Sequence, residues 1–267
     1  MRTGFIGLGN QGTPMAARML QAGYPVTVWA RRPEVATDFA RQGAVAAASI
    51  ADLGAACDHV GICVFADQDV IDVCDQLIPA MQAGGVIAVH STIHPDVCEE
   101  LARRCTEQGI LFVDAPVSGG ALVAEQGALT VMCGGAADAF ARARPVFETF
   151  GKLIVHLGEV GAGQRAKIIN NALMSANMGA ARAAMAAGRT LGLDKAALAE
   201  VINNSSGRSL GFQIYAGMST YLDFAVGTPP MVKDVALLHN MLGDENSETL
   251  RRTADFFLKP AAEALKG

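Results

Sequence analysis

Six residues near the start of the chain, Gly7-Leu8-Gly9-Asn10-Gln11-Gly12, have the spacing G-x-G-x-x-G. In this spacing the first glycine allows a tight turn, the second lets the backbone approach a pyrophosphate, and the third lets a helix pack closely on a strand. Three glycines are a weak signal in a chain with 29 of them. These, however, lie between an apolar segment, residues 3–7, and a helical one, residues 11–22, and that context indicates a dinucleotide site on the helix N-terminus.

The end of the second predicted strand, residues 25–29, indicates which dinucleotide binds. An NAD site places a carboxylate there for the ribose 2′-hydroxyl, whereas an NADP site places a cation. Here Arg31 and Arg32 follow the strand, and the first carboxylate is Glu34. Cations at a helix N-terminus oppose the helix dipole, so a bound 2′-phosphate accounts for them better than a solvated arginine pair. We therefore expect NADP, with NAD as the alternative.

Two further segments carry residue types suited to a reaction on a bound substrate. Ser118, Gly119 and Gly120 follow a predicted strand, and a turn of this composition presents backbone N–H groups that suit a carboxylate. Lys167 and Asn171 are one helical turn apart, so their side chains share one helix face. A lysine exchanges protons near neutral pH where burial or a nearby positive charge lowers its pKa. Taken singly, each feature is more often a turn, a helix end or a solvated lysine.

Four segments together form a more specific pattern. They are GFIGLGNQGTPMAARML at 4–20, DAPVSGG at 114–120, the run from Gly161-x-Gly163 to Asn170-Asn171, and Lys233-Asp234. In this order they resemble the β-hydroxyacid dehydrogenase family, which includes 3-hydroxyisobutyrate dehydrogenases, tartronate semialdehyde reductases and glyoxylate/succinic semialdehyde reductases. The resemblance covers nearly the whole chain, and it implies hydride transfer between a nicotinamide and a small hydroxyacid or its semialdehyde.

The resemblance implies roles on the substrate side for five residues. Lys167 matches the general acid/base that exchanges a proton with the substrate oxygen. Asn171 matches the asparagine that positions the substrate. The positions of Ser118, Gly119 and Gly120 match the loop that holds the substrate carboxylate.

On the cofactor side, Thr92 matches a position near the nicotinamide, and Lys233 matches a lysine that contacts the cofactor. Asp234, in the same pair, is expected to line the substrate pocket. We also assign Val64 and Phe65, at the end of a predicted strand, to the cofactor site.

Three positions depart from the family pattern. Gln11 stands where methionine is typical, and Arg18 stands where asparagine or serine is usual. At about the position of Ala183, relatives often carry a glutamate. The C-terminus is also short for the family. These departures bear on substrate choice and subunit contacts, and they leave the glycines and Lys167 intact.

The predicted elements that position these residues change near residue 158, from alternating strands and helices to helices alone. Predicted strands cover residues 3–7, 25–29, around 45, 59–65, 85–90, 110–113, 129–133 and 153–156. Predicted helices cover residues 11–22, 33–42, 69–81, 95–108, 166–191, 194–203, 209–220, 230–242 and 247–265. Alternation of strands and helices predicts an α/β, Rossmann-type, doubly wound parallel sheet covered on both faces. We therefore expect a dinucleotide-binding domain at 1–158 and an all-helical domain at 159–267.

Composition narrows the class of protein. The chain is 51% hydrophobic and 18% charged, with a net charge of -5, so a basic surface for nucleic acid is not expected. Its first residues lack the apolar core and cleavage site of a signal peptide, and no stretch approaches the roughly 18 consecutive apolar residues that span a membrane. We therefore expect a cytoplasmic protein without membrane contact. Six cysteines without a CxxC pair and five scattered histidines predict no disulfide and no metal site.

The prediction from sequence is an NADP-preferring oxidoreductase acting on a small β-hydroxyacid or its semialdehyde. An imine reductase is the nearest alternative, and Lys167 argues against it because those enzymes generally carry aspartate or tyrosine there. A non-catalytic NADP-binding scaffold is the alternative from another class. The alanine- and methionine-rich helix at 166–191 is hard to bury within one small domain, so we expect a homodimer or homotetramer.

Overall fold

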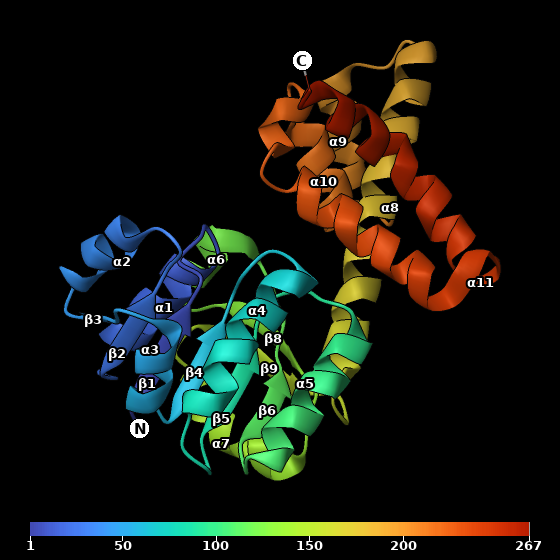
Figure 1. Ribbon diagram of the computed structural model, residues 1–267. Helices are drawn as coiled ribbons and strands as arrows, with labels where there is room; N and C mark the ends of the chain where they lie inside the picture. Colours follow the sequence, from blue (N-terminus) through green and yellow to red (C-terminus); the bar gives the residue numbers. More distant parts are fainter. Residues whose placement is uncertain (267) are drawn as a thin grey trace. The chain divides into compact units, whose positions relative to one another are not determined.

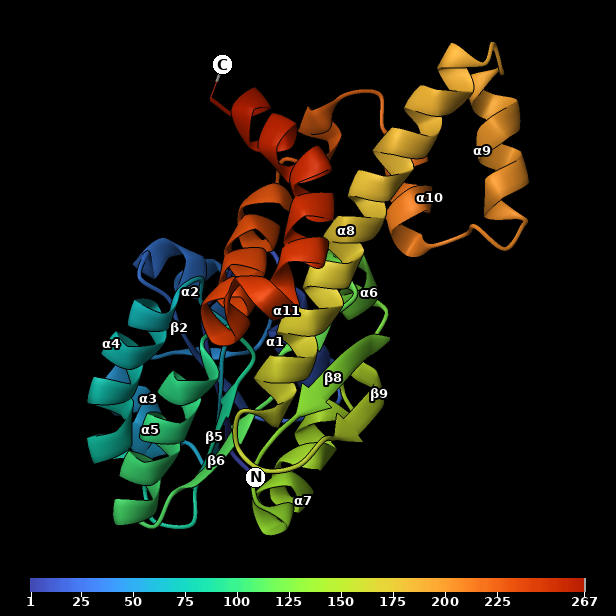
Figure 2. The same ribbon diagram turned by 90° about the vertical axis from the view of Figure 1, so that its right-hand side faces the viewer.

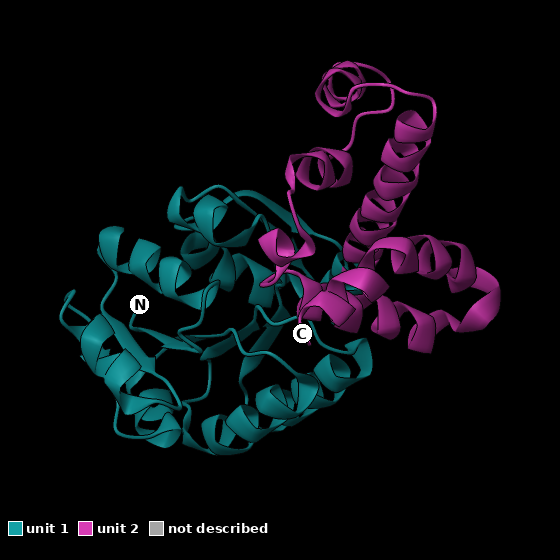
Figure 3. Cartoon of the chain, turned by 90° about the horizontal axis from the view of Figure 1, so that it is seen from above, with its two compact units in different colours: residues 1–167 teal, residues 168–267 magenta. Residues whose placement is uncertain are grey.

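A computed structural model describes residues 1–266. The chain forms two compact units, Met1–Lys167 and a second one that begins at Ile168 (Figure 3). The long helix α8, Ala162–Thr190, belongs to both. Within residues 1–266, no helix combines the length and the apolar character needed to cross a membrane.

The first unit is built on a six-stranded parallel sheet in the order β3-β2-β1-β4-β5-β6 (Figure 1). The strands are β1 Thr3–Ile6, β2 Val26–Trp29, β3 Val45–Ala46, β4 His59–Ile62, β5 Val86–Val89 and β6 Leu111–Asp114. The order reverses direction between β1 and β4. In open α/β sheets a ligand crevice lies at the carboxyl ends of the strands beside such a reversal. The predicted doubly wound α/β fold class is confirmed.

Both faces of this sheet are buried. In β5, Val86 and Ala88 belong to one hydrophobic cluster, whereas Ile87 and Val89 belong to the other, as the alternation of a strand requires. The first face is covered by α1 Gly12–Gln21, α2 Pro33–Ala40 and α7 Ala137–Phe147. The second is covered by α3 Ile50–Ala56, α4 Asp67–Leu77 with the 3-10 turn η1 Ile78–Ala80, and α5 Pro95–Glu107.

The last three strands form a separate small sheet. β8 Leu129–Cys133 pairs antiparallel with β7 Val117–Ser118 and parallel with β9 Gly151–His156. A single bridge between Asp114 and Gly134 links β6 to this sheet. The strands at 129–133 and 153–156 were therefore predicted, but not their place outside the main sheet. The short helix α6, Gly120–Glu125, joins β7 to β8.

The second unit contains no strand within its described residues (Figure 2). Its helices after α8 are α9 Lys195–Asn203, α10 Leu210–Gly217, the 3-10 turn η2 Tyr221–Phe224, and α11 Thr228–Ala264. α11 bends at Gly243, whose φ of 69° is not helical. A Cβ on Gly179 of α8 would lie 1.8 Å from the carbonyl oxygen of Thr253, so α8 and α11 pack backbone against backbone.

Two buried histidines in the first unit make its stability depend on pH. His59 and His90 both pack against Phe147, with ring centroids 5.9 and 5.4 Å away, and His90 Nδ1 lies 2.8 Å from the Ala115 carbonyl oxygen. Burial lowers the pKa of His59 to about 3 and that of His90 to about 4. Both stay neutral in the fold and become charged in the unfolded chain below its ordinary histidine pKa near 6.5.

The stabilisation is therefore complete above pH 6.5 and is lost as the pH falls toward 4 for His90 and toward 3 for His59. We expect the free energy of unfolding to fall across this window, by up to about 1.4 kcal/mol per pH unit for each histidine. Within residues 1–266 neither ring nitrogen of His59 has a hydrogen-bond partner. His59→Leu should accordingly fold well and flatten the pH dependence in urea titrations. An unchanged slope in His59→Leu would show that this histidine does not titrate on unfolding.

Candidate active site

In the glycine turn between β1 and α1, two of the three glycines are packed against other atoms of the protein, and the third faces open space. Gly7 has a φ of 99°, and a Cβ there would lie 2.1 Å from the Cys63 carbonyl oxygen. A Cβ on Gly12 would lie 2.0 Å from the Gly7 carbonyl oxygen. A Cβ on Gly9 would meet no atom within 4 Å. The packing of the protein thus explains the first and third glycines, whereas the second leaves the space in which the motif predicts a pyrophosphate.

This turn forms one wall of a cavity of about 590 Å³ in the first unit. The cavity is lined by Ile6, Gly7, Leu8, Gly9, Asn10, Gln11, Gly12, Trp29, Ala30, Arg31, Arg32, Val35, Cys63, Val64 and Phe65. All ten residues that the sequence assigned to the cofactor within the first 65 positions therefore lie together. The volume is within the range of ligand sites in proteins.

The chemistry of the cavity wall suits an anionic ligand. The first turn of α1 has no acidic residue and no side-chain cap, so neither a carboxylate nor a capping side chain competes with a phosphate at this helix N-terminus. The Nε2 group of Gln11 is buried and has no hydrogen-bond partner within residues 1–266. A buried donor without a partner is costly unless a ligand accepts its hydrogen bond. These observations fit a dinucleotide phosphate at the turn.

Arg31 and Arg32 differ in their surroundings. The Arg31 side chain is 75% exposed, and its guanidinium forms an ion pair of 3.1 Å with Asp69 in the first turn of α4. The other oxygen of Asp69 accepts a hydrogen bond from the Ala66 N–H at 3.1 Å. Arg32 is exposed at the N-cap of α2. The sequence analysis did not anticipate Asp69, because it lies 38 residues beyond Arg31.

The loop after β5 carries Thr92 and is fixed on both sides. Ser91 Oγ accepts a hydrogen bond of 2.8 Å from the Val64 N–H. His94 N–H donates at 3.2 Å to Asp67 at the start of α4. The side chain of Gln164, from the first turn of α8, also contacts this loop. The expected nicotinamide-side loop is therefore hydrogen-bonded to the segment after β4, to α4 and to α8.

The start of α8 is capped by a carboxylate from a distant part of the chain. Asp114 is fully buried, and its two oxygens accept hydrogen bonds from Gly161 N–H at 2.7 Å and Gln164 N–H at 2.9 Å. Gly161 has a φ of 87°, and a Cβ on Gly163 would lie 2.3 Å from the Met132 carbonyl oxygen. Burial raises the pKa of the Asp114 carboxyl, against the effect of the backbone donors.

The predicted helix start at residue 166 is wrong, because the capped helix α8 begins at Ala162. Both glycines of the Gly161-x-Gly163 pattern are needed for the cap, one for its backbone angle and one for close approach. Lys167 then lies in the second turn of α8, where the residue is only 8% exposed.

The predicted carboxylate loop is also the start of a helix. Ser118 ends β7, Gly119 is the N-cap of α6, and Gly120 is its first residue. Gly119 and Gly120 have φ values of 137° and 76°, which only glycine adopts readily. A Cβ on Gly120 would meet no atom within 4 Å. The turn therefore leaves open space above a helix N-terminus, an arrangement that favours a carboxylate.

Three predicted residues in the second unit form one cluster, in which Asn171 and Asp234 are buried and Lys233 is partly exposed. Asn171 Nδ2 donates a hydrogen bond of 2.6 Å to Asp234 Oδ2. Lys233 Nζ lies 3.0 Å from Asp234 Oδ1. Asn170 Nδ2 in turn donates to Asn171 Oδ1 at 3.1 Å. Asp234 thus orients the amide of Asn171, a link that spacing along the chain cannot predict.

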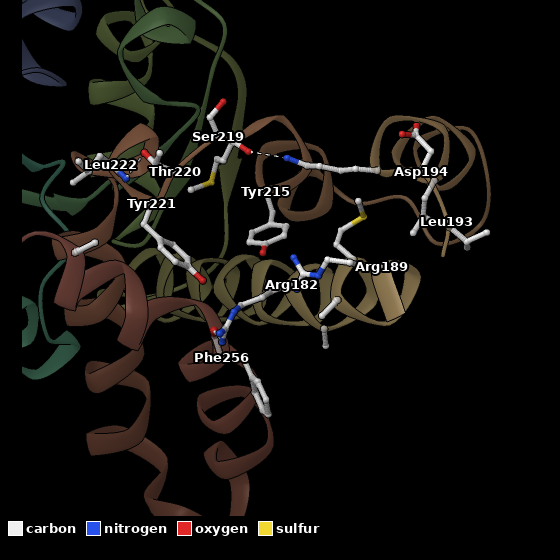
Figure 4. Close-up of a pocket in the computed structure, with 17 residues that line it drawn as sticks. Arg182, Arg189, Leu193, Asp194, Tyr215, Ser219, Thr220, Tyr221, Leu222 and Phe256 are labelled. Atoms are coloured by element: carbon white, nitrogen blue, oxygen red, sulfur yellow. Dashed lines mark hydrogen bonds between the residues drawn. The ribbon is translucent and has the colours of Figure 1, made fainter. Parts of the chain in front are cut away.

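A larger cavity of about 1050 Å³ lies in the second unit (Figure 4). It is bordered by the cations Arg182, Arg189 and Lys195 and by the aromatic rings of Tyr215 and Tyr221. Apart from Ala183, where the sequence departs from its relatives, none of the residues singled out in the sequence lines this cavity. Within residues 1–266 no group of three or more His, Cys, Asp or Glu side chains could hold a metal ion.

Two family models together match most of the chain. The model described as the NAD binding domain of 6-phosphogluconate dehydrogenase matches residues 2–158. The model described as NAD-binding of NADP-dependent 3-hydroxyisobutyrate dehydrogenase matches residues 161–253. The chain is 36% identical over 246 residues to mouse mitochondrial 3-hydroxyisobutyrate dehydrogenase, covering 88% of this chain and 73% of that one. It is 40% identical over 214 residues to 3-hydroxyisobutyrate dehydrogenase of Pseudomonas aeruginosa, covering 79% and 72%.

Solved structures agree with these relatives. A Mycobacterium tuberculosis 3-hydroxyisobutyrate dehydrogenase, solved with L-serine, superposes with a TM-score of 0.89 at 29% identity and covers 98% of this chain and 95% of its own. The protein Psf3 in complex with NADP+ and 2-OPP superposes with a TM-score of 0.83 at 28% identity, covering 96% and 98%.

Proposed function

Because the chain belongs to the β-hydroxyacid dehydrogenase family, and is an oxidoreductase of that family, we propose that it transfers a hydride between NADP and a small β-hydroxyacid or its semialdehyde. The observation that carries this proposal is Lys167, a lysine at the family's acid/base position whose side chain is buried on α8. NADP, when bound, supplies or accepts the hydride. The remaining steps fall to side chains and backbone groups of the protein.

In this proposal, separate residues bind the cofactor, bind the substrate and exchange the proton. The glycine turn at 7–12 and the start of α1 would hold the pyrophosphate, and Arg31 would bind the 2′-phosphate. Ser118 and the backbone of Gly119 and Gly120 would hold the substrate carboxylate. Lys167 would give a proton to the carbonyl oxygen during reduction and take it from the hydroxyl during oxidation.

The cluster in the second unit supports the same assignment. Asn171 is one helical turn beyond Lys167 on α8, and its amide is held by Asp234. An amide fixed in this way is suited to orient a substrate hydroxyl, because it need not be ordered when the substrate binds. Lys233 would contact the cofactor, and its ion pair with Asp234 would connect that contact to Asn171.

The experiment is a turnover assay that follows the absorbance of reduced nicotinamide. The panel contains hydroxyacids, semialdehydes and imines, each with NADPH or NADP+ and, separately, with NADH or NAD+. Turnover of a β-hydroxyacid or semialdehyde is expected. Turnover of imines alone would favour an imine reductase, and NADPH binding without any turnover would favour a scaffold.

The preference for NADP has its own test. Arg31→Ala should weaken NADPH binding about tenfold and leave NADH binding nearly unchanged, since it removes a charge-assisted contact to the 2′-phosphate. Asp69→Asn is the matched variant: it removes the carboxylate that pairs with Arg31 but keeps an acceptor for the Ala66 N–H. Because exposed ion pairs are weak, Asp69→Asn should strengthen NADPH binding by about two- to fivefold. Equal changes for both cofactors, measured by fluorescence titration, would contradict an NADP site at Arg31.

We further infer a homodimer or homotetramer assembled through the second unit. Large apolar side chains there are more than half exposed, among them Leu191, Val201, Leu210, Leu222 and Phe256. Exposed apolar surface of this extent is typical of surfaces that are buried in an assembly. A monomer in light scattering at assay concentration would contradict this inference.

A further inference from the structure

Gln164 is a fully buried polar residue whose side chain leaves its own helix to bond a distant loop. Its Oε1 accepts a hydrogen bond of 3.1 Å from the Ile93 N–H, and its Nε2 donates one of 2.8 Å to the Ser91 carbonyl oxygen. The two ends of one amide thus hold the backbone on both sides of Thr92. A buried amide with both ends bonded has one orientation only, since a flip would place like groups against each other.

The backbone of Gln164 is fixed as firmly as its side chain. Its N–H donates to Asp114, which also caps α8 through Gly161. At the other end of the connection, Ser91 Oγ accepts the N–H of Val64 from the cofactor cavity. A continuous series of hydrogen bonds therefore runs from the cofactor cavity, through the Thr92 loop, to the first turn of α8.

Lys167 follows Gln164 by three residues on the same helix. Residues with this spacing are neighbours on a helix surface, so the Gln164 amide ties the part of α8 that carries Lys167 to the Thr92 loop. We propose that Gln164 is a positioning residue that keeps the nicotinamide-side loop and the proton-exchanging lysine in a fixed relation. This inference rests on the proposed function, in which the two groups act on one substrate.

The two hydrogen bonds at position 164 favour the glutamine amide over methionine and glutamate, whose side chains have similar length. The site requires one donor and one acceptor at the end of a side chain of this length. Methionine has the length but neither group. Glutamate has the shape, but its second oxygen would face the Ser91 carbonyl oxygen unless the carboxyl is protonated. Misplacing reacting groups by about 1 Å costs on the order of 100-fold in rate, so a small shift of the loop would be visible in kcat.

The test compares Gln164→Met and Gln164→Glu with the wild type and with Gln76→Met, a matched change of an exposed glutamine on α4. We expect kcat to fall by 10- to 100-fold in Gln164→Met, while the Kd of NADPH changes by less than about threefold. The primary isotope effect with deuterated NADPH should rise, because hydride transfer becomes slower than product release. Gln76→Met should match the wild type.

Gln164→Glu provides a readout that a purely structural role would not move. Its kcat relative to wild type should recover as the pH falls, since the protonated carboxyl regains a donor for Ser91. A folded Gln164→Met with wild-type kcat, or a Gln164→Glu whose deficit does not change with pH, would overturn the inference. Should Gln164→Met fail to fold, the pH profile of Gln164→Glu decides. A wild type without turnover on the whole panel would instead count against the proposed function.

Discussion

Lys167→Met is expected to lower kcat by about 10³-fold for whichever hydroxyacid or semialdehyde the wild type turns over, with the Kd of NADPH nearly unchanged. The methionine side chain has similar length and suits a buried position, so the fold should persist. What is lost is the group that exchanges a proton with the substrate oxygen while the hydride moves. Steady-state kinetics and a fluorescence titration of NADPH on the same preparation separate the two effects.

Lys167→Arg distinguishes proton exchange from simple charge. An arginine keeps the positive charge but stays protonated at every accessible pH, so it cannot serve as an acid/base. We therefore expect Lys167→Arg to be nearly as slow as Lys167→Met. An arginine variant with substantial kcat would mean that Lys167 acts by electrostatic attraction of the substrate. A methionine variant with full kcat would remove Lys167 from the chemistry altogether.

Asp114→Ala is expected to reduce the free energy of unfolding by about 3 kcal/mol, because it leaves the N–H groups of Gly161 and Gln164 buried without acceptors. The matched control is Ser49→Ala, which removes an ordinary local cap in the same unit, where Ser49 Oγ accepts from the Asp52 N–H at 3.0 Å. A local cap of this kind contributes about 1 kcal/mol. Urea unfolding of both variants measures the difference.

Asp114→Asn is the intermediate case. It supplies one acceptor oxygen, but its NH2 group would face the second backbone donor, so we expect a loss between those of the other two variants. Because the start of α8 also positions Gln164 and Lys167, both Asp114 variants should lose kcat even when fully folded. An Asp114→Ala that costs no more than Ser49→Ala would show that α8 does not depend on this carboxylate.

The sequence predicts correctly the features that residues close together in the chain determine. The strands of the main sheet appear as apolar runs, and the glycine turn predicts its own geometry down to the open space at Gly9. The second unit lacks strands in its described part, as the helical periodicity after residue 163 indicated. The helices α3, α6 and α7 were not predicted: α3 and α6 have only seven and six residues, and α7 contains Pro145. Tertiary packing stabilises all three more than helix propensity does.

The features that local sequence misses are contacts between distant segments. Asp114 caps α8 from 47 residues away, and Gln164 bonds Ile93 across 71. The ion pair of Arg31 with Asp69 likewise joins separate elements. The roles of Lys167, Asn171 and the Ser118 loop stay predictions until the variants are measured.

The cap on α8 also constrains how the chain can fold as it is made. Every strand of the first unit lies before residue 157, yet the buried Asp114 carboxylate has its donors at residues 161 to 164. During synthesis, a sheet that closed before those residues left the ribosome would enclose an anion without hydrogen-bond donors. We therefore expect the first unit to be completed only when the start of α8 arrives, so the segment that carries Lys167 also supplies the hydrogen-bond donors of this buried carboxylate.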